Sequence, residues 1–275
     1  MSTRAQRRAR STRGLAIGAV IALIGLFGAT APALAAPPTA PVVKYVALGD
    51  SYAAGQGAGD PLDACLRSTA AYPVLLDAEP RTNLIRTAAC SGATIADVAT
   101  KQLSQVNKGT TLVTITVGAN DLGIGTIYAA CSVQDDSLEC QTAVAQALVL
   151  VDLNNPTLRN RIKDLVLAVA ERAPNARIVV TDYPMPFVPV LYGLTDQIND
   201  ATIFLNYHLY SGVAAARSAG ANVLFAAAAG GFHGHEIGSR DPWLGADPSD
   251  PVTFLHPTAR GQELYRFVIR ETLDR

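Results

Sequence analysis

The sequence is poor in several residue types that mark particular classes of protein. Its 275 residues include only 4 cysteines, 2 methionines and 1 tryptophan, and aromatic residues make up 6%. No two cysteines have C-x-x-C spacing and none lies close to a histidine, so the sequence indicates no metal site. With so few aromatic side chains, the sequence offers no series of rings on which sugars could stack, which weighs against a polysaccharide deacetylase. Repeats, heptads and charged tails are also absent, which disfavours a structural protein.

Long apolar runs are absent except near the N-terminus, where one extends from residue 15 to about residue 29. Five arginines precede this run, and the small residues Ala33-Leu34-Ala35 follow it. This order predicts a signal peptide over residues 1–36, cleaved after Ala35 or Ala36, and therefore a secreted, extracellular protein. A membrane anchor is the alternative, but the run is short for a span and glycines interrupt it. Arg7-Arg8 leaves open whether export uses the general or the twin-arginine route.

Positive charge is scarce in the remaining chain. Removal of residues 1–36 takes away five arginines and no acid, which leaves 17 basic and 23 acidic residues, a net charge of −6. This balance argues against a nucleic-acid partner. Residues 37–275 suffice for one α/β domain with a full core, and we expect that domain to be a monomer.

Four cysteines in an exported chain predict two disulfides. The sequence allows three pairings. Cys131 and Cys140 bracket a polar loop, and Cys65 lies between Ser51 and Cys90, so the simplest pairing is Cys65–Cys90 with Cys131–Cys140. A metal site built from these cysteines is the alternative, and their spacing does not favour it.

Short apolar, β-rich runs alternate with helix-like segments along residues 37–275. The predicted strands are residues 44–48, 83–87, 112–117, 177–182 and 223–227. The predicted helices are residues 72–78, 94–103, 141–151, 156–173, 196–219 and 258–273. Such alternation predicts an α/β fold, a single three-layer α/β/α domain with a central parallel sheet in flavodoxin-like order. Two long non-periodic stretches, residues 184–193 and 230–255, are expected to rim a functional site.

Polar residues follow the first three of these strands, where a parallel sheet presents its chemistry. Ser51 follows the first strand in Gly49-Asp50-Ser51, Gly92 follows the second, and Asn120 follows the third in Gly118-Ala119-Asn120-Asp121. His256 precedes the last helix. Each segment alone is ordinary turn or N-cap chemistry, and Asp121 could cap a helix while Asn120 faces a site. Their combination and order favour a functional constellation.

These four segments resemble the SGNH (GDSL) hydrolase superfamily, in its secreted actinobacterial lipase and esterase branch. The resemblance spans nearly all of residues 37–275, and it implies the flavodoxin-like fold and the same two disulfides. It also implies Ser51 as nucleophile, His256 as its base, and an oxyanion hole formed by the backbone N–H groups of Ser51 and Gly92 and the side-chain amide of Asn120. Such a mechanism needs neither a metal nor another cofactor.

One position departs from the commonest pattern of this superfamily. Many members place an aspartate three residues before the histidine, where this sequence has Thr253. We therefore expect a Ser51–His256 dyad in which a backbone carbonyl, that of Thr253, orients the imidazole, as in some relatives. Asp250 or Asp247 is the alternative orienter. Asp50 is expected to shape the loop around Ser51.

Ester hydrolysis is the activity that this resemblance implies, on a small-molecule or lipid ester. Secretion favours lipid acyl esters, including phospholipids, with transient contact to a lipid interface. Residues 187–192 and Pro242-Trp243-Leu244 could line an apolar acyl groove or could serve only in packing. A carbohydrate deacetylase or short-chain esterase, and a catalytically silent cell-envelope binding module, are the alternatives. An ordinary α/β-hydrolase is disfavoured because the chain has no G-x-S-x-G segment.

Overall fold

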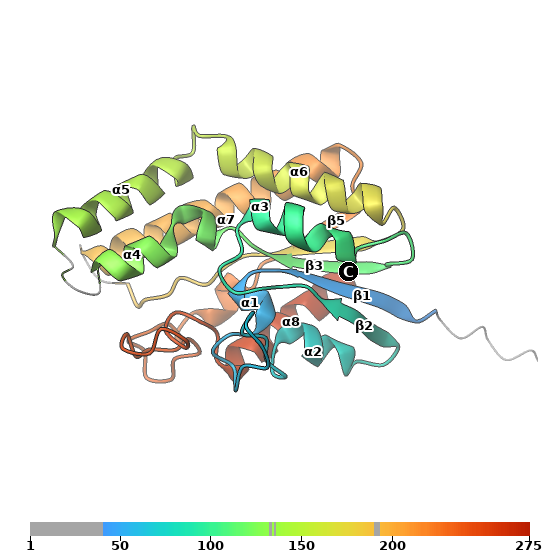
Figure 1. The fold of residues 1–275 in the computed structure, drawn as a ribbon, viewed down its shortest axis with the longest axis horizontal. Helices are drawn as coiled ribbons and strands as arrows, with labels where there is room; N and C mark the ends of the chain where they lie inside the picture. Colours follow the sequence, from blue (N-terminus) through green and yellow to red (C-terminus); the bar gives the residue numbers. More distant parts are fainter. Residues whose placement is uncertain (1–40, 132–133, 135, 190–192) are drawn as a thin grey trace, which may run out of the picture. The chain divides into compact units, whose positions relative to one another are not determined.

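The computed structural model describes residues 41–131, 134, 136–189 and 193–275, so the predicted signal peptide lies outside the described residues. The described chain forms a five-stranded sheet with strand order β2-β1-β3-β4-β5 (Figure 1). The strands are β1 (Val43–Gly49), β2 (Thr82–Thr87), β3 (Leu112–Thr116), β4 (Arg177–Thr181) and β5 (Val223–Ala226). Every neighbouring pair is parallel. The predicted α/β/α domain with a flavodoxin-like parallel sheet is therefore confirmed.

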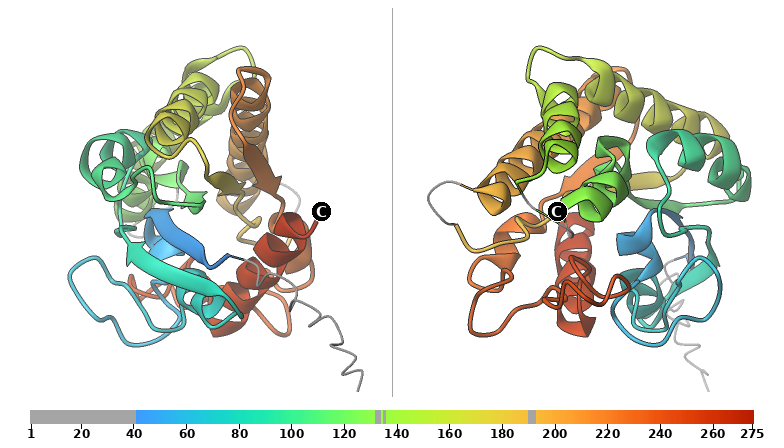
Figure 2. Two further views of the ribbon diagram at one scale, coloured as in Figure 1. Left: turned by 90° about the vertical axis from the view of Figure 1, so that its right-hand side faces the viewer. Right: turned by 60° about the vertical axis from the view of Figure 1, so that its left-hand side comes forward.

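Helices cover both faces of this sheet (Figures 1 and 2). One face carries α3 (Ile95–Asp97), α6 (Thr157–Arg172) and α7 (Leu194–Ser218), with α4 (Ile124–Cys131) and α5 (Leu138–Val151) at one end. The other face carries α1 (Ser51–Ala54), α2 (Tyr72–Asp77) and α8 (Ala259–Leu273).

Each face of the sheet has its own apolar core. Val46 and Leu48 of β1 pack into the core beneath α3, α6 and α7, whereas Tyr45 and Ala47 pack into the core beneath α2 and α8. Alternate side chains of a strand point to opposite faces, and all four of these residues are buried. A strand that is apolar on both sides is typical of a parallel sheet covered by helices. The burial of β1 fixes its carboxyl end, where Ser51 follows.

The helices largely match the sequence prediction, with two differences at one end of the domain. Helix α5 begins at Leu138, three residues earlier than expected, because Ser137 accepts a hydrogen bond from the backbone N–H of Cys140 at 3.1 Å and caps the helix. Helix α4 was not predicted at all. The predicted helix 94–103 is present as α3 followed by a turn of π-helix (Val98–Gln102) and a turn of 3₁₀-helix (Leu103–Gln105).

Both predicted disulfides are formed. Cys65–Cys90 joins the loop after α1 to the loop after β2, and Cys131–Cys140 joins the end of α4 to the first turn of α5. Each bridge therefore holds a segment that borders the carboxyl end of the sheet. Along the described part of the chain, no helix combines the length and the apolar character needed to cross a membrane.

Candidate active site

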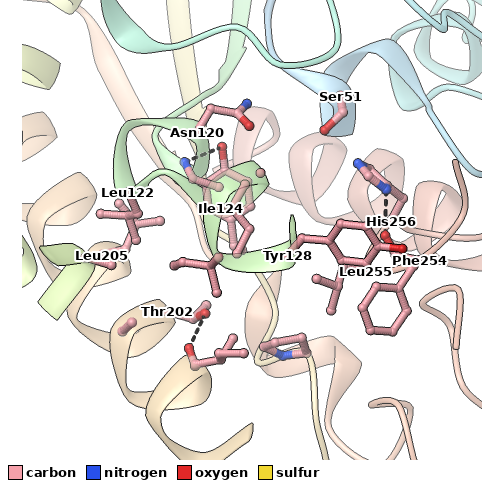
Figure 3. Close-up of a pocket in the computed structure, with 18 of the residues that line it drawn as sticks. Ser51, Asn120, Leu122, Ile124, Tyr128, Thr202, Leu205, Phe254, Leu255 and His256 are labelled. Atoms are coloured by element: carbon pink, nitrogen blue, oxygen red, sulfur yellow. Dashed lines mark hydrogen bonds between the residues drawn. The ribbon is translucent and has the colours of Figure 1, made fainter. Parts of the chain in front are cut away.

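The four residues of the predicted constellation line one pocket at the carboxyl end of the sheet. Ser51 follows β1 and Asn120 follows the neighbouring strand β3, and Figure 3 shows both side chains at the same opening as His256. The order of strand addition reverses here, because β2 lies on one side of β1 and β3 lies on the other. In open α/β sheets, this switch point is where ligands bind.

The backbone around Ser51 is held in a tight turn from strand to helix. Gly49 has φ +137°, and a Cβ at this position would collide with the carbonyl oxygen of Thr116. Ser51 is the first residue of α1, and its hydroxyl makes no hydrogen bond to any described residue. The hydroxyl is thus free to react, although the residue as a whole is only 7% exposed.

Asp50 shapes this turn, as predicted from the sequence. Its Oδ1 accepts a hydrogen bond from the backbone N–H of Tyr52 at 3.0 Å and caps α1, and its Oδ2 accepts one from the Tyr183 hydroxyl at 2.5 Å. Burial raises the pKa of the Asp50 carboxyl to about 7, and these hydrogen bonds offset only part of that rise. The side chain makes no hydrogen bond to His256 and therefore does not orient it.

The imidazole of His256 is oriented by a backbone carbonyl, but not by the one that the sequence suggested. Its Nδ1 lies 2.8 Å from the carbonyl oxygen of Phe254, so Nδ1 carries the proton and Nε2 keeps its lone pair. The Thr253 carbonyl instead accepts the backbone N–H of His256 at 3.0 Å. The turn that makes this bond places Leu255 at φ +64° and aims the Phe254 carbonyl at the ring.

Neither aspartate offered as the alternative orienter makes a hydrogen bond to His256. The Asp250 carboxylate accepts hydrogen bonds from the Thr253 hydroxyl at 2.7 Å and from the backbone N–H of Val252 at 3.0 Å. Asp247 bonds both the hydroxyl and the backbone N–H of Ser249. Both carboxylates therefore shape the loop that carries His256.

His256 is neutral over a wide pH range. Burial lowers the pKa of its imidazole to about 4, and the hydrogen bond to the Phe254 carbonyl offsets this only in part. The Tyr52 ring lies against it, with ring centres 5.9 Å apart, and the Tyr52 hydroxyl donates to the carbonyl of Leu255 at 2.6 Å. A neutral imidazole with a free Nε2 is the protonation state that a general base requires.

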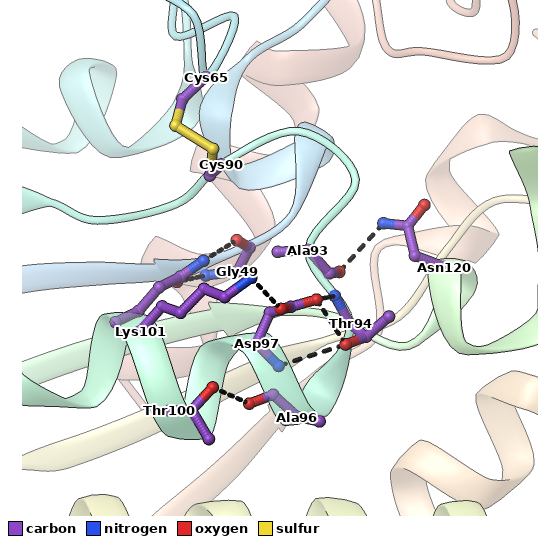
Figure 4. A network of polar contacts seen from close by, with 11 residues as sticks. Gly49, Cys65, Cys90, Ala93, Thr94, Ala96, Asp97, Thr100, Lys101 and Asn120 are labelled. Carbon is purple, nitrogen blue, oxygen red and sulfur yellow. Dashed lines mark hydrogen bonds and ion pairs between the residues drawn. A yellow bond between two sulfur atoms is a disulfide. The ribbon is translucent and has the colours of Figure 1, made fainter.

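Three hydrogen-bond donors border the pocket beside Ser51. The backbone N–H groups of Ser51 and Gly92 make no hydrogen bond to any described residue. The Asn120 side chain donates to the carbonyl oxygen of Ala93 at 3.1 Å, which leaves its second amide N–H available (Figure 4). Gly92 has φ +77°, and a Cβ there would point into open space, so glycine serves both the backbone conformation and the approach of a ligand.

Asp121, beside Asn120, caps a helix other than its own. Its Oδ2 accepts a hydrogen bond from the backbone N–H of Ile95, the first residue of α3, at 2.9 Å. Its Oδ1 lies 3.3 Å from Arg161 of α6. These contacts hold the Asn120 turn against the loop that contains Gly92.

An apolar cavity of about 250 Å³ extends from this polar cluster between α4, α5 and α7. Figure 3 shows Leu122, Ile124 and Leu205 on one side of it and Phe254 and Leu255 on the other. Its buried lining includes small and branched apolar residues: Leu122, Ile127, Val144, Ala147, Ala201 and Leu205.

No described residue of the two segments that the sequence suggested for an acyl groove lines this cavity. Phe187 lies outside the lining, and residues 190–192 lie outside the described residues. Leu244 is buried in the core beneath α8, and Trp243 stacks on His235 with ring centres 3.6 Å apart. Of the two stretches expected to rim the site, Pro184 and Pro186 of the first and Pro251, Phe254 and Leu255 of the second line the pocket.

The remaining histidines have structural surroundings. His208 is buried on α7 with its Nε2 3.1 Å from the carbonyl of Val151. His233 lies beside Glu236, and His235 lies beside Asp241 in an exposed loop. No group of three or more His, Cys, Asp or Glu side chains within the described ranges is arranged to hold a metal ion.

The fold and the polar cluster define an α/β/α hydrolase of the SGNH type. The chain belongs to the GDSL-like lipase/acylhydrolase family, whose family model matches residues 47–264. It is 35% identical over 269 residues to a lipase of Streptomyces rimosus, covering 94% of this chain and 95% of that one.

Two solved structures are similar along most of the chain. They are an extracellular lipase from Streptomyces rimosus, at 33% identity, and phospholipase A1 from Streptomyces albidoflavus, at 32% identity. Each has a TM-score of 0.73, and each comparison covers 84% of this chain and 99% of the other. The protein is therefore a carboxylic ester hydrolase of the actinobacterial lipase branch.

Proposed function

We propose that this protein is a secreted serine hydrolase that cleaves the acyl esters of lipids through an acyl-enzyme on Ser51. The observation that carries the proposal is the shared pocket, in which an unpaired serine hydroxyl and a neutral imidazole meet three hydrogen-bond donors and an apolar cavity. Each of these features supplies one requirement of ester cleavage.

In the first half of the reaction, the Ser51 Oγ attacks the ester carbonyl carbon while His256 Nε2 accepts the hydroxyl proton. The carbonyl oxygen becomes an oxyanion, which receives hydrogen bonds from the N–H groups of Ser51 and Gly92 and from the Asn120 amide. The bond from carbon to the alcohol oxygen then breaks. His256 passes its proton to that oxygen, and the alcohol leaves the acyl group on Ser51.

In the second half, His256 Nε2 takes a proton from a water molecule, whose oxygen attacks the acyl carbon. Collapse of the second oxyanion breaks the bond to Ser51 Oγ, and the proton returns from His256 to that oxygen. A carboxylic acid is released. The Phe254 carbonyl, 2.8 Å from Nδ1, holds the ring in one tautomer through both halves.

The apolar cavity supports a lipid acyl chain as the substrate group. It opens at Ser51 and runs between α4, α5 and α7, so an acyl carbon at the serine would place the hydrocarbon chain among buried aliphatic side chains. Burial of each methylene contributes about 0.8 kcal/mol, which favours longer chains until the cavity is full. Similarity to a phospholipase A1 extends the proposal to phospholipids.

The proposal also includes secretion of the protein after cleavage of a signal peptide. The arginine-rich, apolar and small-residue segments of residues 1–36 support a cleaved signal peptide, and two disulfides suit an oxidising compartment. Expression in an actinobacterial host should release a protein whose N-terminus is Ala36 or Pro37. Mass spectrometry of the culture medium tests this, and an intact N-terminus on cell-bound protein would contradict it.

The deciding experiment compares the mature protein with Ser51→Ala on p-nitrophenyl esters of increasing acyl length, and on phosphatidylcholine vesicles. The wild type should hydrolyse both, with its best rate on medium or long chains, and Ser51→Ala should fall to background. A fluorophosphonate probe should label Ser51 in the wild type alone. Ser104→Ala, which alters an exposed serine away from the pocket, is the matched control.

Three other outcomes would point elsewhere. Hydrolysis that survives Ser51→Ala would overturn the serine mechanism. Activity restricted to acetylated sugars or to acetate esters would replace the lipid substrate with a deacetylase or short-chain esterase. A folded protein that neither hydrolyses esters nor takes the probe would be a binding module.

A further inference from the structure

Gln56 is a buried polar residue that the proposed chemistry leaves without a role. It lies between Gly55, which ends α1 at φ +82°, and Gly57, at φ +83°. The turn alone does not explain the choice of a glutamine here, because the side chain points away from α1 toward two loops that are distant in the sequence. The residue as a whole is 5% exposed.

The side-chain amide of Gln56 joins the loop of Gly92 to the loop of His256. Its Oε1 accepts a hydrogen bond from the Ser91 hydroxyl at 2.5 Å, and its Nε2 donates to the carbonyl of Val252 at 2.9 Å. The Nε2 also lies 3.5 Å from the carbonyl of Pro251 and 3.4 Å from His256 Nδ1. Its own backbone N–H donates to the carbonyl of Ser51 at 3.0 Å.

These partners allow only one orientation of the amide. The Val252 carbonyl can only accept, so the atom that faces it must be the NH₂ group. The Ser91 hydroxyl then donates to the amide oxygen. Because His256 Nδ1 already donates to the Phe254 carbonyl, its 3.4 Å contact with Gln56 Nε2 joins two donors and contributes packing rather than a hydrogen bond.

The turn at Gly57 fits closely against the same histidine. A Cβ at Gly57 would lie 2.9 Å from the Cβ of His256 and 3.5 Å from the backbone of Thr253. Residues 55–57 therefore cannot shift toward the His256 loop, and the Gln56 amide prevents that loop from moving away. Together these two contacts fix the separation between residues 55–57 and the His256 loop.

The geometry points to Gln56 as a positioning residue of the proposed reaction. It ties together the segments that carry the nucleophile, the Gly92 donor and the base, through Ser51, Ser91 and Val252 respectively. Since no carboxylate among the described residues supports His256, the fixed distance between base and oxyanion donors has to come from such neutral contacts. This inference rests on the proposed serine mechanism, and it adds a residue that touches neither substrate nor reacting atoms.

The test is a double-mutant cycle between Gln56 and Ser91. Gln56→Met keeps the approximate side-chain volume and removes the amide, and Ser91→Ala removes only the hydroxyl. We expect Gln56→Met to lower kcat for a p-nitrophenyl ester by roughly 10- to 100-fold and to leave KM within about twofold, because the ester-binding cavity is unchanged. Ser91→Ala should give a smaller loss, and the double variant should be no slower than Gln56→Met alone.

Gln262→Met is the matched control. Gln262 is also a buried glutamine whose amide joins two segments, accepting from the backbone N–H of Tyr72 at 2.8 Å and donating to the carbonyl of Tyr52 at 3.0 Å. It does not contact Ser91. Its effect on kcat should therefore multiply with that of Ser91→Ala.

Two results would overturn the inference. One is wild-type kcat in a folded Gln56→Met variant, and the other is multiplication of the Gln56→Met and Ser91→Ala effects in the cycle. If Gln56→Met does not fold, Ser91→Ala decides alone, and an unchanged kcat in that variant contradicts the role. Residual activity in Ser51→Ala, measured beside them, would instead count against the serine mechanism itself.

Discussion

Asn120 has one amide N–H bonded to Ala93 and a second available beside Ser51. If that second group stabilises the oxyanion, Asn120→Ala should lower kcat by ~10²–10³ and change KM much less. Asn120→Asp should be at least as slow, because it replaces the donor by a carboxylate that repels the developing charge. Steady-state kinetics on a p-nitrophenyl ester measure both.

Asp121→Asn is the control for this prediction. It keeps an oxygen that can accept the backbone N–H of Ile95, and the side chain lies outside the pocket lining. Its kcat should stay near that of the wild type. A small effect of Asn120→Ala, equal to that of Asp121→Asn, would show that the Asn120 turn matters only for structure.

His256 should keep the enzyme active in mildly acidic solution. Its pKa is lowered from 6.5 to about 4, so the imidazole stays neutral well below the pH at which an ordinary histidine becomes charged. The acid limb of kcat/KM should therefore fall near pH 4. A pH–rate profile with a short-chain ester measures it, and an acid limb at pH 6.5 or above would contradict the burial argument.

The lowered pKa of His256 also affects stability, and this effect is unfavourable at the acidic pH at which the effect on activity is favourable. Between pH 6.5 and about 4 the unfolded chain binds a proton at His256 and the folded chain does not, so this group lowers the free energy of unfolding as pH falls through that window. His256 alone therefore weakens the fold in the same pH window in which its neutral imidazole keeps the enzyme active.

At the scale of elements, the cavity depends on the packing of α5 against α7. Ala147 of α5 and Ala201 of α7 are small residues in its buried lining. Ala201→Leu should fill part of the cavity, so it should reduce kcat/KM for long-chain esters and leave acetate and butyrate esters nearly unchanged. The ratio of the two rates is the measurement.

Ala214→Leu provides the comparison, because Ala214 lies on the exposed side of the same helix and outside the cavity. It makes the same chemical change and should leave the chain-length preference as in the wild type. Equal losses on short and long esters in Ala201→Leu would indicate that the acyl chain binds elsewhere.

The sequence predicted the strands well, each end falling within one residue of the observed one, because five short apolar runs between turn residues have few other interpretations. Helix α4 was missed for a physical reason. Its eight residues include Gly125, Thr126 and the β-branched Ile124 and Ile127, which have low helix propensity. Contacts with α5 and the Cys131–Cys140 bridge supply its stability, and none of these is visible in local sequence.

In the candidate site, too, sequence motifs predicted some features, whereas others depend on the folded backbone and its packing. Ser51, Gly92, Asn120 and His256 were identified because their four segments occur together in the order typical of SGNH (GDSL) hydrolases. The choice between the carbonyls of Thr253 and Phe254 depends on the left-handed backbone of Leu255. A leucine in the sequence does not predict that conformation. The acyl groove was predicted on residues 187–192 and 242–244 because these loop segments are apolar, whereas the described lining of the cavity comes mainly from helix residues.

At the scale of the whole molecule, the fold keeps two carboxylates in its interior, just after the carboxyl ends of β1 and β4. Asp50 is 1% exposed, and burial raises its pKa to about 7, while Asp182 is 5% exposed, and burial raises its pKa to about 6. Asp182 accepts hydrogen bonds from the backbone N–H groups of Ala228 and Ala229 and so holds the loop after β5. Both groups make the stability of the domain depend on pH near neutrality.

The sign of this dependence follows from Asp50. Between pH 3.8 and about 7 the folded chain keeps a proton that the unfolded chain has lost, so the stabilisation from Asp50 is complete at acidic pH and is lost as pH rises through about 7. Asp50→Asn removes this titration and keeps a good N-cap for α1. The melting temperature of the variant should therefore gain on that of the wild type as pH rises from about 4 to about 7, and the difference should be constant above that range. Because Asp182 and His256 titrate in both proteins, the difference between the two curves isolates Asp50, and a difference that does not change with pH would mean that its carboxyl has an ordinary pKa in the fold.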